Sequence, residues 1–313
     1  MPSTHLWGND KKGRDAPPKF PPPRRCAMKL IASQRLWSPA EEADVLPALQ
    51  SWGVDGVAVL FPRLGEEDGL LRRATRLVAD WARLGLQTPV LLDPVDGSHG
   101  DLWGETSEPV FRRMHVALEA AAALGAETVV LGAPSLRRRP LPLFPDRERD
   151  TLLLRMQALG DRAAALGVFV SIKPVPSTSG GVFWRNADEI IGFIQEAEAQ
   201  AMRPFLDAAG LSREENPRAT LATYAGVSVA FGANEAFGGP LRDKGGARHR
   251  LWATDLARLG VYGRAPDWLV WDADGPGIGV QRDPLPVLAG QAQAVRALYG
   301  AALQTPPVGD HVA

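Results

Sequence analysis

Residues 121–131, AAALGAETVVL, run from the end of an alanine-rich helix through one glycine into a β-branched strand. The same order returns at residues 163–172, AAALGVFVSI. A glycine that follows a helix can take the left-handed conformation without a Cβ penalty, and so ends the helix cleanly. Helix, glycine and buried strand in this order are typical of a parallel sheet whose strands are joined by helical crossovers.

Working outward from these two stretches, eight apolar runs follow Met28, and their starts lie 25 to 41 residues apart. The runs are residues 29–37, 54–64, 86–95, 127–135, 168–175, 202–210, 227–235 and 266–274. Amphipathic stretches lie between them, at residues 68–84, 108–124, 147–166 and 250–259, and an eighth helix is predicted at 284–303. Glycines at the helix-to-strand junctions predict left-handed caps at Gly53, Gly85, Gly125, Gly167, Gly226 and Gly260.

Eight strand–helix units predict a single (β/α)₈ TIM barrel over residues 28–305, because eight parallel strands close into a barrel that side chains can fill. Closure requires the strand that begins at Lys29 to pair with the strand that begins at Pro266. An open doubly wound sheet is the rival fold. It is disfavoured because no G-x-G-x-x-G motif follows the first strand.

The two ends are predicted to lie outside the barrel. Residues 1–27 hold six prolines and six Lys or Arg without helical or strand periodicity. Such a segment buries too little apolar surface to offset its ordering entropy. It is either a disordered basic tail or a stretch that precedes a true start at Met28. Residues 306–313 are predicted to be a flexible C-terminus.

Composition narrows the function classes. The 313 residues carry 35 Lys or Arg and 36 Asp or Glu, a formal net charge of −1. Because both signs are mixed along the chain, no nucleic-acid partner is expected. No apolar run reaches the length of a membrane helix, and a lone cysteine fits a reducing compartment. The expected location is cytoplasmic, with no membrane partner.

In a (β/α)₈ barrel the chemistry lies at the C-terminal ends of the strands. Candidates at these ends are Arg35, Trp37, Phe61, Arg63, Asp93, Asp96, His99, Ser135, Arg137, Arg138, Arg139, Lys173, Trp184, Arg185, Asp207, Asn234, Glu235, His249, Asp272 and Asp274. Carboxylates, cations and indole rings on one rim would form a polar pocket for a small molecule. The alternatives are that the tryptophans plug the loops over the barrel and that residues 137–139 form a solvated loop.

Several of these stretches resemble the xylose isomerase-like TIM barrels, the sugar phosphate isomerase/epimerase family. The similar stretches are EPVFRRMHVALEAAAALGAETVVLGAP (108–134), LGDRAAALGVFVSIKP (159–174), RPFLDAAG (203–210), ARHRLWATDLARLGVYG (247–263) and PDWLVWDADG (266–275). The resemblance implies a divalent metal such as Mn²⁺, Zn²⁺ or Mg²⁺, held by carboxylates and histidines at the strand ends.

The metal-site pattern of that family is degenerate here. Lys173 stands where the resemblance implies a glutamate, and Gly210 stands where it implies a histidine. Asp207, His249 and Asp272 are the remaining candidate ligands. At an effective dielectric near 20, an ammonium about 4 Å from a dication is repelled by roughly 8 kcal/mol. No cofactor is therefore expected, and Lys173 is predicted to replace the metal's charge by pairing with Asp207 and Asp272.

The resemblance and these substitutions predict an isomerase- or epimerase-like enzyme that moves protons on a small polyol, keto or phosphorylated metabolite. Asp207 or Asp272 would be the general base, Lys173 would stabilise an enolate, and His249 would shuttle a proton. Arg35, Trp37, His99, Arg137, Trp184, Arg185 and Glu235 would bind the substrate, which could be anionic. The alternative is a non-catalytic barrel that binds a metabolite or serves as the inactive partner of a homologue; a homo-oligomer is also open.

Overall fold

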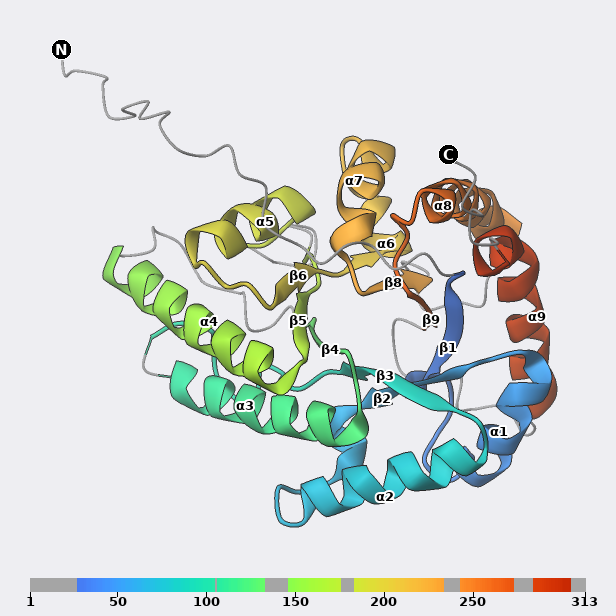
Figure 1. Cartoon of the computed structure of the whole chain (residues 1–313), viewed down its shortest axis with the longest axis horizontal. Coiled ribbons are helices and arrows are strands. Elements are labelled where there is room, and N and C mark those ends of the chain that lie inside the picture. The colour runs from blue at the N-terminus through green and yellow to red at the C-terminus, as the bar shows by residue number, and fades with distance from the viewer. Residues whose placement is uncertain are drawn as a thin grey trace, which may run out of the picture.

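The structure is a computed structural model, and it describes residues 27–104, 106–132, 146–175, 183–233, 243–272 and 284–304. Within these ranges, nine parallel strand segments form one sheet in the order β6-β5-β4-β3-β2-β1-β9-β8-β7. Their bounds are β1 Lys29–Ser33, β2 Gly56–Leu60, β3 Gln87–Leu92, β4 Thr128–Leu131, β5 Phe169–Ile172, β6 Met202–Pro204, β7 Leu206–Asp207, β8 Ala230–Ala233 and β9 Trp268–Trp271. The sheet curls into a nearly closed barrel with helices around it (Figure 1). The predicted TIM barrel is therefore confirmed.

The first and last strands pair as predicted. Lys29 is aligned with Trp268, and Ala32 is aligned with Trp271, in a parallel register. β1 pairs with β2 on its other side, with Ile31 opposite Gly56. Closure removes two sheet edges that would otherwise invite aggregation.

One predicted strand differs from the structure. The run at 202–210 forms two short segments, β6 and β7, which are separated by Phe205. β6 pairs with β5, while β7 pairs with β8. The Phe205 backbone N–H still donates to the Ile172 carbonyl at 2.8 Å, and the Phe205 ring belongs to the barrel interior. The two segments therefore occupy one strand position of the barrel, with a bend at Phe205.

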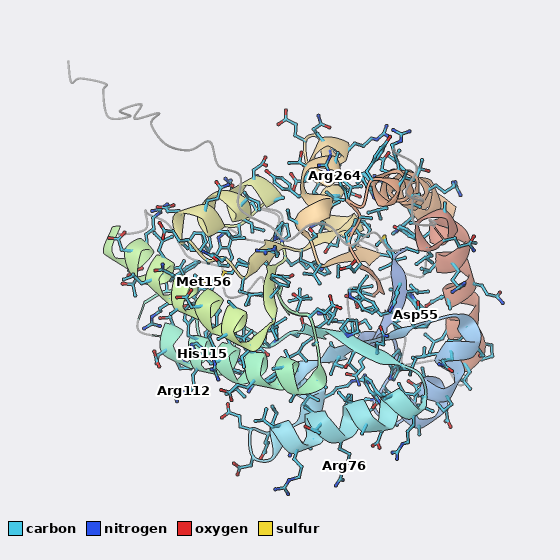
Figure 2. The ribbon with its side chains drawn as sticks, viewed as in Figure 1. Asp55, Arg76, Arg112, His115, Met156 and Arg264 are labelled. Atoms are coloured by element: carbon cyan, nitrogen blue, oxygen red, sulfur yellow. The ribbon has the colours of Figure 1, made fainter. Side chains whose placement is uncertain are left out.

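Helices follow the strands and cover the outer face of the sheet. Their bounds are α1 Glu42–Leu49, α2 Leu70–Arg83, α3 Ser107–Leu124, α4 Asp146–Leu166, α5 Ala187–Glu196, α6 Ala208–Leu211, α7 Pro217–Tyr224, α8 Asp243–Val261 and α9 Pro284–Leu303. Charged side chains such as Arg76 on α2 and Arg112 on α3 project outward from this layer (Figure 2). None of the helices in the described ranges is long and apolar enough to cross a membrane.

Glycine caps end four of the predicted helices. Gly53, Gly85, Gly125 and Gly167 all have φ between +65° and +72°. The prediction was wrong for two positions. Gly226 lies inside a 3₁₀ turn over Ala225–Val227, and Gly260 lies within α8, which ends one residue later. Gly263, with φ of +65°, takes the left-handed turn at the junction before β9.

Strand alternation divides the core into two layers. One layer is the cluster of apolar side chains inside the barrel, which includes Ile31, Ala58, Val90, Val130 and Val270. Their strand neighbours, such as Leu30 and Leu269, belong to the larger core between sheet and helices. Successive side chains in a strand point to opposite faces, so each strand feeds both layers. This alternation decides which side chains at the strand ends face the barrel axis.

Candidate functional site

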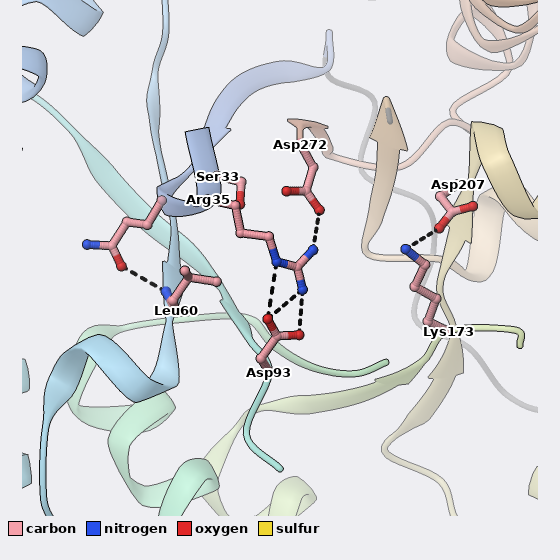
Figure 3. A network of polar contacts seen from close by, with 8 residues as sticks. Ser33, Arg35, Leu60, Asp93, Lys173, Asp207 and Asp272 are labelled. Carbon is pink, nitrogen blue, oxygen red and sulfur yellow. Dashed lines mark hydrogen bonds and ion pairs between the residues drawn. The ribbon is translucent and has the colours of Figure 1, made fainter. Parts of the chain in front are cut away.

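Five charged side chains gather at the C-terminal ends of the strands (Figure 3). They are Arg35, Asp93, Lys173, Asp207 and Asp272, here called the strand-end cluster. Arg35 comes from the turn after β1, Asp93 follows β3, Lys173 follows β5, Asp207 ends β7 and Asp272 follows β9. All five are among the strand-end candidates that the sequence offered, and all but Asp93 were given a catalytic or binding role.

Arg35 holds two carboxylates at once. Its Nε donates to Asp93 Oδ2 at 3.2 Å, and its Nη2 donates to Asp93 Oδ1 at 2.6 Å. Its Nη1 donates to Asp272 Oδ2 at 2.8 Å. All three guanidinium nitrogens are thus engaged, and the contact with Asp93 is the forked geometry in which arginine binds carboxylate most strongly. Arg35 connects the ends of β1, β3 and β9 across the rim.

The backbone around Arg35 is fixed by its neighbours. Ser33 Oγ accepts the Arg35 backbone N–H at 3.2 Å and so caps the 3₁₀ turn Gln34–Leu36. Gln34 is buried; its Oε1 accepts the Leu60 N–H and its Nε2 donates to Glu42, each at 2.8 Å. These bonds hold the turn against the end of β2, which leaves the Arg35 side chain aimed over the barrel mouth (Figure 3).

Asp93 meets Arg35 through a rare backbone conformation. Leu92 packs inside the barrel, so continued alternation would turn the next side chain outward. Asp93 instead has a φ of +54°. Few non-glycine residues adopt this left-handed region, and Asp tolerates it better than most. Strained backbone of this kind clusters at ligand sites, where the surrounding structure maintains it.

Lys173 and Asp207 form the second part of the cluster. Lys173 Nζ lies 2.8 Å from Asp207 Oδ2, which confirms the predicted pairing of Lys173 with Asp207. The Asp207 side chain is 1% exposed and that of Lys173 is 21% exposed, so the ammonium covers the carboxylate. Asp207 Oδ1 also accepts the Gly210 backbone N–H. Asp272, the other predicted partner of Lys173, contacts Arg35.

Two glycines make room for the Asp207 carboxylate. A Cβ at position 210 would lie 2.8 Å from Asp207 Oδ1, and a Cβ at position 232 would lie 2.7 Å from Asp207 Cβ. The resemblance implied a histidine at position 210. Any side chain there would crowd the carboxylate oxygen in the present arrangement, so Gly210 and the buried Asp207 belong together.

His249 lies on the other side of the sheet. It is 3% exposed on α8, and its Nδ1 lies 2.6 Å from the Tyr299 hydroxyl of α9. The Tyr299 ring packs 6.4 Å from Phe231, whose side chain belongs to the outer core. Burial lowers the pKa of His249 to about 4 and raises that of Tyr299. This position between sheet and helices does not fit the predicted role of His249 as a proton shuttle or metal ligand.

The two predicted tryptophans are packed inside the protein. Trp37 is 2% exposed, and its Nε1 donates to Glu42 at 3.4 Å. Trp184 is fully buried, with ring centroids 4.1 Å from Phe183 and 5.1 Å from Phe193. This packing matches the alternative interpretation, in which the tryptophans plug the loops, better than it matches a wall that touches substrate.

The remaining predicted substrate-binding residues contact residues other than the cluster, or lie outside the described ranges. His99 Nδ1 contacts Asp96 Oδ1 at 3.0 Å in the loop after β3. Hydrogen bonds from Ser98, and the nearby His99, lower the pKa of Asp96. Arg185 forms an exposed ion pair with Glu189 at the start of α5. Arg137 and Glu235 lie outside the described residues.

Asp93 is the cluster residue that was a strand-end candidate but received no catalytic or binding role in the prediction. The stretch QTPVLLD at residues 87–93 does carry the signal, an acidic residue directly after a buried strand. Sequence alone ranked Asp93 no higher than several other strand-end acids. The bond to Arg35, from a turn 58 residues away, distinguishes it.

The chain shares its family pattern and its fold with known proteins. The model of the xylose isomerase-like TIM barrel family matches residues 46–251. No curated protein matches the chain. Among solved structures, 3-keto-D-glucoside 4-epimerase from E. coli superposes with a TM-score of 0.67 and 16% identity, covering 86% of this chain and 99% of that one.

Two further structures have the same fold. D-psicose 3-epimerase from Clostridium cellulolyticum H10, solved with D-tagatose, gives a TM-score of 0.66 at 13% identity and covers 88% of this chain and 99% of that one. A xylose isomerase-like TIM barrel protein from Mycobacterium smegmatis, solved in complex with magnesium, gives 0.57 at 16% identity and covers 88% and 98%. At these identities the similarity establishes the fold.

The cluster as it stands does not fit a divalent ion. Each of its three carboxylates already bonds a cationic side chain, Asp207 through Lys173 and the other two through Arg35. In the part of the chain that the structure describes, no three His, Cys, Asp or Glu side chains come together as a metal site. A metal would have to displace both cations and then sit beside them, against the repulsion of like charges.

Proposed function

This chain belongs to the xylose isomerase-like TIM barrel family, and on that premise we propose that it is an isomerase or epimerase. The proposed reaction is proton transfer at a carbon next to a carbonyl group in a small polyol, keto or phosphorylated metabolite. The observation that carries the proposal is the Lys173–Asp207 ion pair, 2.8 Å long, at the end of the barrel where such enzymes react. The shared fold of two sugar epimerases supports it.

Exposure divides the roles within the cluster. Lys173 is partly exposed above a buried Asp207, so its ammonium faces a ligand while Asp207 positions it. An ammonium held beside a substrate carbonyl stabilises the negative charge that develops on oxygen when a neighbouring C–H loses its proton. Lys173 would then supply the electrostatic part of the reaction.

The general base is sought among the carboxylates that a ligand can reach. The Asp93 side chain is 37% exposed, against 9% for Asp272 and 1% for Asp207. A general base must come within hydrogen-bond distance of the proton it removes. We therefore assign the base to Asp93, with Asp272 as the second choice, and leave His249 out of the chemistry.

A second candidate function is a non-catalytic barrel that binds a metabolite, alone or as the partner of an active homologue. The specific observation in its favour is that all three carboxylates of the cluster are already ion-paired. In this version the cations and carboxylates would bind a ligand's hydroxyl, carbonyl or anionic groups without proton transfer. The cytoplasmic location and an oligomeric partner stay predictions under both candidates.

Hydrogen–deuterium exchange separates the two candidates. The protein is incubated in D₂O with ketopentoses, ketohexoses, their phosphates and small keto acids, and loss of C–H signals is followed by ¹H NMR. The proposal expects exchange at a carbon next to the carbonyl. It also expects Lys173→Met to slow exchange by about 100-fold or more, the usual cost of removing one charge-stabilising donor.

The matched control is Arg149→Met. Arg149 pairs with Glu196 on the exposed surface between α4 and α5, so the exchange rate should stay within about twofold of wild type. Binding of one of these compounds with no exchange would favour the non-catalytic barrel. Exchange that is equally fast in Lys173→Met would remove Lys173 from the mechanism.

A further inference from the structure

The contacts of Arg35 resemble those that a bound cation would make. One guanidinium bonds two carboxylates from the ends of β3 and β9, Asp93 with two nitrogens and Asp272 with the third. Its side chain is 23% exposed, and the Asp272 side chain is 9% exposed. The Asp93 side chain is 37% exposed, so Asp272 is the carboxylate that is shielded from water. A shielded carboxylate beside a second carboxylate requires a counter-charge.

Local structure commits both partners to this contact. Ser33 caps the turn that presents Arg35, and Asp93 reaches it through a left-handed backbone at φ +54°. At the ends of β5 and β7, Lys173 supplies the counter-charge of the third carboxylate, Asp207. Two cations thus serve three carboxylates, and the described cluster carries a net charge of −1, from +2 and −3.

We propose that Arg35 and Lys173 are built-in counter-ions that make the strand-end cluster independent of any divalent metal ion. In this view Arg35 binds no substrate; it takes the part of a cation between Asp93 and Asp272. The inference deepens the proposed function, since it makes that chemistry indifferent to chelators. It also stands without that function, because counter-charge is a property of the folded protein.

The experiment measures thermal stability with and without divalent cations. Wild-type protein is dialysed against EDTA, and its melting temperature is then measured in buffer alone and with 1 mM MgCl₂, MnCl₂ or CaCl₂. A ligand that binds only the folded state raises the melting temperature. We expect wild type to shift by less than about 1 °C with every ion, and metal analysis of the purified protein to find well under one ion per chain.

Variants at Arg35 make the test specific. Arg35→Met should lower the melting temperature by about 5 °C, because Asp93 and Asp272 lose their shared cation. Added Mn²⁺ should then recover at least half of that loss. Arg35→Lys keeps the charge but loses the fork, so it should melt at an intermediate temperature and ignore Mn²⁺. In Arg35→Met combined with Asp272→Asn, the Mn²⁺ response should disappear.

The control is again Arg149→Met, which removes a forked arginine–carboxylate contact from an exposed surface. It should change the melting temperature by less than about 1 °C, with no metal response. A wild-type protein that Mn²⁺ stabilises, or that carries stoichiometric metal, overturns the proposal even if Arg35→Met fails to fold. So does an Arg35→Met protein that folds and ignores Mn²⁺. Failure of the proposed function would appear separately, as absent deuterium exchange with this melting pattern intact.

Discussion

The strand-end cluster and the His249–Tyr299 pair are both polar groups enclosed by the barrel, but they lie on opposite faces of the sheet. Asp207 is covered by a charged partner inside the barrel mouth, where Lys173 is still partly exposed. His249 lies between sheet and helices, with a neutral hydroxyl as its partner. In the first region charges are compensated by opposite charges. In the second, burial keeps the ring neutral, because desolvation disfavours the charged form.

This difference separates residues that can contact a ligand from residues that pack the helices against the sheet. Inward strand-end positions open onto the barrel mouth, where active sites of this fold lie. A helix residue that faces the sheet is shielded from solvent and ligands by its own helix. The two regions should therefore respond differently to substitution, metal ions and pH.

Lys173→Glu is expected to have the largest effect. It removes the partner of the buried Asp207 and adds a fourth carboxylate to the strand-end cluster, so the free energy of unfolding should fall by about 3–5 kcal/mol. A divalent ion at about 100 times its Kd would return roughly 2.7 kcal/mol. Because His249 lies beyond the sheet, the ligands would be carboxylates, and Mn²⁺ or Mg²⁺ should suffice without the preference for Zn²⁺ that imidazole confers.

Urea unfolding of Lys173→Glu, with and without each ion, measures this prediction. Lys173→Met is the control: it also leaves Asp207 without its ammonium but adds no carboxylate, so metal ions should restore less of its stability. A selective Zn²⁺ rescue would mean that a histidine reaches the cluster, and it would break the proposed separation of the two regions.

The second largest effect is expected from acid, which should lower the stability of the protein through the His249–Tyr299 pair. The pKa of His249 is about 4 in the folded protein, against 6.5 for an unperturbed histidine. Between these values the unfolded chain binds a proton that the folded chain does not, so stability falls as the pH drops from 6.5 toward 4. The full difference corresponds to about 3 kcal/mol.

Comparing urea midpoints of wild type and His249→Gln from pH 7 to pH 4 isolates this effect. The variant should lose about 3 kcal/mol less over the window, although it starts from a lower stability at pH 7. If stability falls with pH as steeply in His249→Gln as in wild type, the His249 ring is not buried in solution as it is in the structure.

The sequence predicted the architecture well because the architecture depends on local, repeated signals. Glycine-capped helices and β-branched strands recur along the chain, and each unit can be recognised alone. Where the signal was weakest the prediction was wrong: Gly226 and Gly260 follow the pattern in sequence, yet Gly263 makes the turn. The bend at Phe205 depends on pairing with two different neighbours, which no local window contains.

The candidate site was predictable only in part, because it depends on which way a side chain faces. Strand ends made Lys173 and Asp207 candidates, and the family resemblance singled them out as a pair. Asp93 reaches the cluster through a left-handed backbone that sequence does not reveal. His249 was placed in the site by its position along the chain, and the face of α8 decides otherwise. Motifs identify strand ends more reliably than they identify the face of a helix.

The smallest expected effect compares two glycines, one beside the strand-end cluster and one on the outer face of α9. Gly232 faces inward on β8, where a Cβ would lie 2.7 Å from Asp207 Cβ and 3.1 Å from the Phe205 ring. Gly290 lies on the exposed face of α9, where an added Cβ would meet nothing within 4 Å. Gly232→Ala should cost about 1–3 kcal/mol by overpacking. Gly290→Ala should gain about 0.5–1 kcal/mol, because alanine is the better helix former.

Opposite signs from the same chemical change would show that the space around Asp207 is filled by the cluster itself. Both variants are measured by urea unfolding, and Gly232→Ala is also tested for deuterium exchange. A shift of Asp207 by a few tenths of an ångström would move Lys173, so exchange should slow in Gly232→Ala and stay unchanged in Gly290→Ala. If Gly232→Ala is as stable as wild type, the cluster has room to relax. The tight packing that fixes Lys173 would then have to come from residues on its other side.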